Sequence, residues 1–200
     1  MQPVYSPTDQ PIVNVVGEKV ALGPLRRDLM PLYDRWFNDF EAGLAYFVQL
    51  RPHTREAREM WYERLAQGDP NSTEFLIYER ATMRPIGKTA LDQIDHFDRT
   101  ASFGIIIGEK DCWGKGYGTE TAILMLDYGF TLLGLHNIIL TVDSYNERAI
   151  RAYRRAGFKE IGRRREARRR GGRVYDVISM DCVATDFRGP TLSALLPAPQ

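Results

Sequence analysis

Residues 100–142 read TASFGIIIGEKDCWGKGYGTETAILMLDYGFTLLGLHNIILTV, and this stretch decides the fold. Thr100–Gly108 contains the continuous β-branched run Ile105-Ile106-Ile107, which is typical of a strand buried on both faces. From Thr119 to Leu133, apolar residues recur at helical spacing. Asn137–Val142 is a second β-branched run. A strand, a long helix and another strand in this order predict a parallel βαβ unit.

The flanking segments extend this unit in a regular alternation. Before it we expect a strand at Lys19–Leu22, helices at Asp28–Asn38 and Thr54–Gln67, and strands at Glu74–Glu79 and Pro85–Asp95. After it we expect a helix at Glu147–Arg155, then a hairpin of Phe158–Arg165 with Val174–Val183, turned at Gly171-Gly172. The predicted order is β-α-α-β-β-β-α-β-α-β-β.

These elements form one predicted α/β domain that spans residues 17–185. Residues 1–16 carry three prolines among polar neighbours, and we expect an extended arm there. Residues 186–200 are expected to form a tail, in which Leu192, Leu195 and Leu196 could dock on the domain surface.

Composition narrows the class of protein. The formal net charge of the 200 residues is +1, so the whole molecule has no strong field that would attract DNA or a membrane. The two cysteines, Cys112 and Cys182, suggest no disulfide framework and favour a reducing cytoplasm. We see no signal peptide and no membrane-spanning run. The three histidines are scattered along the sequence, so no metal site is expected. The chain is predicted to be a monomer or a homodimer.

A glycine-rich loop joins the buried strand to the long helix. It reads Trp113-Gly114-Lys115-Gly116-Tyr117-Gly118-Thr119. Alternate glycines allow the backbone to aim several N–H groups at one point, and the following helix adds the partial positive charge of its N-terminus. Lys115 could add a formal charge. The loop therefore suits an anion such as a pyrophosphate.

Two other phosphate-binding loops fail on spacing. A Walker A loop needs a Ser or Thr after its Lys, and Gly116 stands there instead. A dinucleotide fingerprint has the spacing G-x-G-x-x-G near the start of its unit, whereas this loop has G-x-G-x-G late in the chain. A simple tight turn from strand to helix remains an alternative interpretation of the glycines.

A second block follows the next strand. Asn146-Glu147-Arg148-Ala149-Ile150-Arg151-Ala152-Tyr153-Arg154-Arg155-Ala156-Gly157-Phe158, together with the glycine loop, resembles the GCN5-related N-acetyltransferase (GNAT) superfamily. The match looks most like the branch of ribosomal-protein N-terminal acetyltransferases, with spermidine acetyltransferases close by. One departure is visible, because Trp113 stands where the pattern usually has Gln or Arg. The order of elements agrees from about Lys19 to Val183.

The resemblance implies a fold, a cofactor and a set of roles. The fold would be a mixed, mostly antiparallel sheet with a central splayed parallel strand pair and helices on both faces. The cofactor would be acetyl-coenzyme A. Ile105, Ile106 and Ile107 would present backbone groups to its pantetheine arm, and Asn146 would hydrogen-bond that arm. Gly114, Lys115, Gly116, Tyr117, Gly118 and Thr119 would hold its pyrophosphate, and Tyr153 would be the general acid near the thioester sulfur.

The residue chemistry agrees with these roles. A phenol with a pKa of about 10 stays protonated at neutral pH and can donate to a thiolate of pKa about 8.5. Asn146 is also a good helix N-cap, and Tyr153 could be a plain core residue. No base is evident, because Thr141 stands where some relatives have glutamate. Asp92, Asp95 and Asp143 are candidates. An α-amine, with a pKa of about 8, loses its proton more easily without a base than a polyamine does. The sequence therefore favours a protein N-terminus over a small amine as the acceptor.

Several features leave alternatives open. The basic run Arg163–Arg173 could contact RNA, an acidic ribosomal surface or the 3′-phosphate of the cofactor, or it could be a solvated hairpin tip. A covalent route through Cys112 has no nearby activating residue in the sequence. Tyr33, Trp36 and Phe37 of the first helix, with Tyr46 and Phe47 after it, could line an acceptor pocket between the first two helices or form the core. The whole chain could also be a non-catalytic acyl-coenzyme A sensor, or a ribosome- or RNA-associated protein that acts through the basic run.

Overall fold

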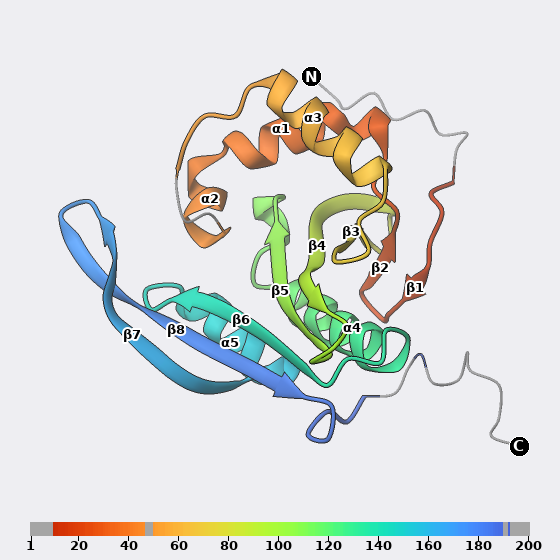
Figure 1. Ribbon diagram of the computed structural model, residues 1–200. Helices are drawn as coiled ribbons and strands as arrows, with labels where there is room; N and C mark the ends of the chain where they lie inside the picture. The colour runs from red at the N-terminus through yellow and green to blue at the C-terminus, as the bar shows by residue number, and fades with distance from the viewer. Residues whose placement is uncertain (1–9, 47–49, 190–191, 193–200) are drawn as a thin grey trace, which may run out of the picture.

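The computed structural model describes residues 10–46, 50–189 and 192, and these residues build one eight-stranded sheet (Figure 1). The strands lie in the order β1-β2-β3-β4-β5-β6-β8-β7, and every neighbouring pair is antiparallel except β5–β6. Their bounds are β1 Val15–Val16, β2 Val20–Gly23, β3 Thr73–Glu79, β4 Arg84–Asp95, β5 Thr100–Ile107, β6 Asn137–Asp143, β7 Lys159–Arg170 and β8 Arg173–Val183. The predicted mixed sheet with a central parallel pair is confirmed.

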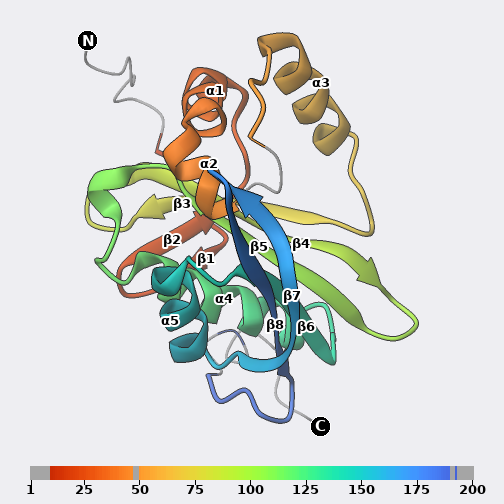
Figure 2. The same cartoon turned by 90° about the vertical axis from the view of Figure 1, so that its left-hand side faces the viewer.

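Helices cover both faces of this sheet (Figures 1 and 2). The α-helices are α1 Met30–Asn38, α2 Phe40–Tyr46, α3 Arg55–Ala66, α4 Tyr117–Thr131 and α5 Glu147–Ala156. Short 3-10 turns lie at Arg27–Leu29 and Lys110–Cys112. Alternate residues of β3 point to opposite sides, because Ile77 joins the core under α4 and α5 while Leu76 and Tyr78 join the core under α1 and α3.

The central parallel pair separates after a short stretch. β5 and β6 pair only from Thr100 opposite Asn137 to Ser102 opposite Ile139. Beyond that point β5 stays paired with β4, through Gly87 opposite Ile107, and β6 stays paired with β8 as far as Asp143. The two strands therefore diverge, and the later half of β5 turns one backbone edge toward a gap in the sheet. This is the splayed pair that the resemblance implied.

Strand β1 and helix α2 were not predicted from the sequence. Val15 and Val16, expected in the arm, pair with β2 as strand β1, which is too short to show an alternating hydrophobic pattern. Helix α2 was not expected at all. The carboxylate of Asp39 caps it by accepting N–H groups of Glu41 and Ala42 at 2.9 and 3.2 Å, so a new helix begins directly after α1.

The hairpin is longer than predicted. β7 does not end at Arg165, because a bulge lets the strand resume and continue to Arg170. Glu166 adopts a left-handed φ of 51° in this bulge, and its N–H donates to the Asp176 carboxylate at 2.9 Å. Most of the basic run therefore belongs to a strand, and only its last residues lie at the hairpin tip.

The C-terminal segment packs on α4 through two described residues, Phe187, whose ring lies 5.5 Å from that of Phe130, and Leu192. Leu192 is buried, and its N–H donates to the Asp127 carboxylate at 2.8 Å. Leu195 and Leu196, like residues 1–9 of the expected arm, lie outside the described residues. In the described part of the chain, no helix is both long and apolar enough to cross a membrane.

Candidate active site

The glycine loop adopts the geometry that an anion site needs. Gly114 and Gly116 have φ values of 78° and 91°, in the left-handed region that favours glycine. Gly116 is the N-cap of α4, so the backbone N–H groups at the start of that helix open onto the loop. A Cβ built on Gly114 would meet no atom within 4 Å, so this glycine is needed for its backbone conformation and not for space.

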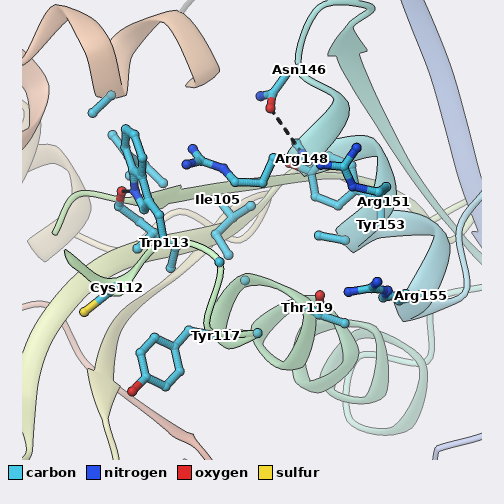
Figure 3. Close-up of a pocket in the computed structure, with 18 residues that line it drawn as sticks. Ile105, Cys112, Trp113, Tyr117, Thr119, Asn146, Arg148, Arg151, Tyr153 and Arg155 are labelled. Atoms are coloured by element: carbon cyan, nitrogen blue, oxygen red, sulfur yellow. Dashed lines mark hydrogen bonds between the residues drawn. The ribbon is translucent and has the colours of Figure 1, made fainter. Parts of the chain in front are cut away.

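A cavity of about 270 Å³ lies between this loop, the end of β5 and helix α5 (Figure 3). Eight of the predicted loop and strand residues line this cavity, together with Asn146 and Tyr153 of the second block. The lining includes Ile105, Ile106, Ile107, Gly114, Gly116, Tyr117, Gly118, Thr119, Asn146 and Tyr153. Lys115 is exposed and does not line the cavity. Ile105 and Ile107 are only half-buried because they face this cavity, so the run is not buried on both faces as predicted.

Tyr153 contributes the one phenol that α5 presents to the cavity. Its ring packs edge-on against Phe103 and Phe158, with centroids 6.0 and 5.9 Å away. Burial raises the pKa of Tyr153 to about 12. Its hydroxyl has no hydrogen-bond partner among the described residues, so it can donate to a molecule in the cavity. Tyr153 is thus a protonated donor at neutral pH.

Asn146 serves as the N-cap of α5. Its side-chain oxygen accepts the N–H of Ala149 at 3.2 Å, and the residue lines the cavity. The capping interpretation of Asn146 is therefore correct, and its expected contact with pantetheine stays a prediction. Ile150, four residues after Asn146, is buried in the hydrophobic core.

Three arginines of α5, which the sequence analysis did not select, also line the cavity: Arg148, Arg151 and Arg155 (Figure 3). The Arg148 guanidinium lies 3.8 Å from the centre of the Trp113 ring, on the opposite wall. The Trp113 N–H donates to the carbonyl of Ile107 at 2.8 Å, so the indole is anchored to the end of β5. Cationic side chains around an anion-binding loop suit a ligand with several phosphates.

The comparisons with known proteins agree with this geometry. A family model described as an acetyltransferase (GNAT) domain matches residues 19–159. The chain belongs to this family. Acetyl-coenzyme A is the acetyl donor of GNAT enzymes, and the residues here fit it: a glycine cradle, a helix N-terminus and cationic walls border one cavity. Membership places the chain among the acetyl-coenzyme A-dependent N-acetyltransferases.

Individual relatives carry different names. Spermidine N(1)-acetyltransferase of Vibrio cholerae is 36% identical over 152 residues, which cover 70% of this chain and 87% of that protein. The Escherichia coli protein of the same name is 46% identical over 76 residues, only 38% of this chain and 40% of that protein. Human alpha/beta-tubulin-N-acetyltransferase 9 is 29% identical over 159 residues, or 74% and 75% of the two chains.

A solved structure extends the likeness to the whole fold. Vibrio cholerae spermidine N-acetyltransferase, in complex with CoA and spermine, superposes with a TM-score of 0.77 at 28% identity and covers 86% of this chain and 99% of that one. The branch expected from the sequence is therefore corrected, because the relatives named above are spermidine and tubulin acetyltransferases and not ribosomal-protein acetyltransferases.

Glu120, in the first turn of α4 directly after the glycine loop, anchors this helix to the turn between β1 and β2. It was not among the predicted site residues. Glu120 accepts three backbone N–H groups of the β1–β2 turn, from Glu18, Lys19 and Val20, at 2.6, 2.8 and 2.9 Å. The Lys19 ammonium also approaches the carbonyl of Lys115 at 3.4 Å. A Cβ on Gly17 would lie 2.8 Å from the Glu120 carboxylate, so glycine is required for this close approach.

The candidate bases are engaged elsewhere. Asp92 accepts the Ser72 hydroxyl at 2.6 Å, and Asp95 accepts two N–H groups of its own turn. Asp143 pairs with Arg168 at 2.8 Å and lies 2.9 Å from the Tyr145 hydroxyl. None of the three lines the cavity.

The remaining candidates are structural. Cys112 lines the cavity, but burial raises the pKa of its thiol, which disfavours the thiolate that a covalent route needs. Tyr33, Trp36 and Phe37 are buried in the core under α1 and α3. The side chain of Tyr46 and all of Phe47 lie outside the described residues. No group of three metal-ligating side chains occurs within the described ranges.

Proposed function

We propose that this chain moves an acetyl group from acetyl-coenzyme A to a primary amine by direct attack of the amine on the thioester. The observation that carries the proposal is that the glycine loop, the splayed end of β5 and Tyr153 all border one cavity. A simple strand-to-helix turn would not require the other two features. A cofactor-sensing module would require no proton donor beside the thioester.

The proposed cofactor contacts follow the walls of the cavity. Backbone N–H groups from Gly114 to Thr119 hold the pyrophosphate, and Arg151 and Arg155 add positive charge. Backbone groups of Ile105–Ile107 and the Asn146 side chain hold the pantetheine arm. Among the described residues β5 has no partner strand on this side after Ser102, so backbone groups on this edge are available to that arm, although the Ile107 carbonyl already accepts the Trp113 N–H.

The chemistry needs little more from the protein. Bound acetyl-coenzyme A supplies an acyl thioester. The Tyr153 hydroxyl keeps its proton because its pKa is about 12, and it can donate a hydrogen bond to the departing thiolate, while the proton that the attacking amine loses completes the free thiol. The hydrophobic ring packing holds the hydroxyl in place, and an α-amine with a pKa near about 8 has enough neutral fraction to attack without a strong base.

We propose a polypeptide α-amine as the acceptor because of the charges near one end of the cavity. This end, here called the acceptor side, is where the amine would enter. This side is bordered by α2, whose Ala42 lines the cavity. Nearby carboxylates already have cationic partners: Asp39 and Glu41 share Lys110 at 2.8 and 2.6 Å, which leaves one net negative charge, and Asp143 pairs with Arg168. A polyamine, with several positive charges, would find few free carboxylates there.

A spermidine-like polyamine is the second candidate. The observation that favours it is the 36% identity with the Vibrio cholerae enzyme, whose name gives spermidine as its acceptor. The human relative is named for a protein acceptor, so acceptor class differs within the family at this level of similarity.

The test is coenzyme A release with a matched panel of acceptors. We expect turnover with a peptide that has a free N-terminus and none with the same peptide acetylated at its N-terminus. Higher kcat/KM for spermidine than for every peptide would favour the second candidate. Tight coenzyme A binding with no turnover on any amine would refute catalysis and leave a sensing module.

A further inference from the structure

The basic run forms a strongly charged projection from the sheet. Residues 163–173, here called the arginine hairpin, contain seven arginines and one glutamate, a net charge of +6 in a chain whose total is +1. They belong to the end of β7 and the start of β8, which extend as a curved ribbon beyond the rest of the sheet (Figure 1). Such a concentration of like charge is unfavourable unless an anion balances it.

Part of this charge is balanced within the chain and part is not. Arg163 pairs with Glu160 and Asp176, and Arg168 pairs with Asp143. Four other arginines are exposed and have no carboxylate partner among the residues that the structure describes; these are Arg164, Arg165, Arg169 and Arg173. Their guanidinium groups are available to an external anion.

The arginine hairpin is attached beside the acceptor side of the active site. Asp176 of β8 and Ser144 bond reciprocally, with the Ser144 N–H on the Asp176 carbonyl at 2.9 Å and the Asp176 N–H on the Ser144 hydroxyl at 3.1 Å. The rings of Tyr145 and Tyr175 meet edge-on at 4.8 Å. The next residue, Asn146, lines the cavity.

Tyr145 also contacts α2, on the opposite side of the acceptor side of the cavity. The Tyr145 hydroxyl lies 2.7 Å from the carbonyl of Leu44 in α2, and Ala42 of α2 lines the cavity. Tyr145 thus connects β8 at the base of the arginine hairpin, where Tyr175 pairs with Arg168, to the α5 N-terminus and to α2. A chain that leaves the cavity on this side would pass close to the hairpin.

The hairpin also presents an unpaired strand edge. β7 is the last strand of the sheet and, within the described ranges, pairs only with β8, so its other edge has no partner strand there. An extended peptide can add to such an edge through backbone hydrogen bonds. Alternate side chains on a strand are about 6.6 Å apart, so arginines and carboxylates on paired strands would match in spacing.

We propose that the arginine hairpin binds an acidic segment of the acceptor polypeptide, a few residues after the α-amine that is acetylated. The proposal rests on the proposed function and names its acceptor class. RNA is the weaker occupant, because the arginines have no free aromatic side chain among them for base stacking and the ring of Tyr175 packs on Tyr145.

The experiment compares two peptides and two double variants. One peptide carries several Glu and Asp residues after its N-terminus, and the other has Gln and Asn at the same positions. Arg165→Gln with Arg169→Gln removes two unpaired charges from the hairpin. Arg64→Gln with Arg188→Gln removes two exposed charges elsewhere and is the matched control.

We expect the wild type and the control variant to prefer the acidic peptide at low salt. The hairpin variant should lose about fivefold in kcat/KM for the acidic peptide, mainly through KM, and change little with the neutral one. Adding salt should reduce the wild-type preference in the same way.

Two results would overturn the proposal. The first is equal kcat/KM for both peptides in the wild type. The second is an acidic-peptide preference that survives in the hairpin variant. Submicromolar binding of a single-stranded RNA that the hairpin variant loses, without any peptide preference, would assign the surface to nucleic acid instead. If no amine is acetylated at all, it is the proposed function that fails.

Discussion

Replacing Tyr153 with phenylalanine removes one hydroxyl from the cavity and almost nothing else. The ring contacts with Phe103 and Phe158 remain, and the hydroxyl has no partner in the described part of the protein. Tyr153→Phe should therefore leave the free energy of unfolding within about 0.5 kcal/mol of the wild type. A change in activity would then report chemistry and not folding.

The expected loss follows from what the hydroxyl does. General acid catalysis is worth roughly 100- to 10,000-fold, and a thiolate of pKa about 8.5 is already a fair leaving group, so we expect the lower end. kcat should fall about 100-fold, which is about 2.7 kcal/mol in the barrier. KM for acetyl-coenzyme A should change less than about twofold, because the hydroxyl is not asked to bind the ground state.

The assay is steady-state coenzyme A release from pH 6 to about pH 10. Burial raises the pKa of Tyr153 to about 12, so its acid form persists over this range and wild-type kcat should not decline at alkaline pH. Tyr128→Phe is the matched control, since Tyr128 packs on Phe75 and lies outside the cavity lining. Equal kcat for wild type and Tyr153→Phe on every active acceptor would refute the acid role.

Three further perturbations test the framework around the site. Glu120→Gln replaces the carboxylate that holds three N–H groups, and should lower the unfolding free energy by about 2 kcal/mol and weaken coenzyme A binding in calorimetry; unchanged affinity would mean that the contact is purely structural. Gly116→Ala forces a side chain into a φ of 91°, at a cost of about 1–2 kcal/mol, and calorimetry should show weaker coenzyme A binding, whereas wild-type affinity would count against the cradle. Glu74→Gln leaves the buried Lys88 ammonium without its ion-pair partner, and urea unfolding should show a loss of about 3–5 kcal/mol; a loss below about 1 kcal/mol would mean that water reaches this pair.

The parts of the site that could be predicted from sequence are those set by local chemistry. The glycine loop and the Asn146–Tyr153 helix each carry their spacing within a short segment, and the structure brings both to one cavity. The parallel unit between Thr100 and Val142 was found for the same reason. Local pattern, however, gave no sign of β1 or α2, because one is two residues long and the other begins at a side-chain cap.

The missed functional residues act across long sequence separations. The Glu120 carboxylate accepts backbone N–H groups that lie about one hundred positions earlier in the chain, and no periodicity in either segment indicates that contact. Arg148 contacts Trp113, 35 positions earlier in the chain, and only the fold brings the two side chains together. The departure at Trp113 was the available signal, since an indole in place of a cationic or amide side chain invites a cation from elsewhere.

The central claim is that backbone amides of the glycine loop and the start of α4 hold the pyrophosphate of coenzyme A. Amide resonances of the 15N-labelled protein, followed while coenzyme A is added, test it most directly. We predict that the signals of Gly114, Gly116 and Gly118 shift together and saturate. The claim is contradicted if millimolar coenzyme A leaves these three signals unmoved, whether or not it binds elsewhere.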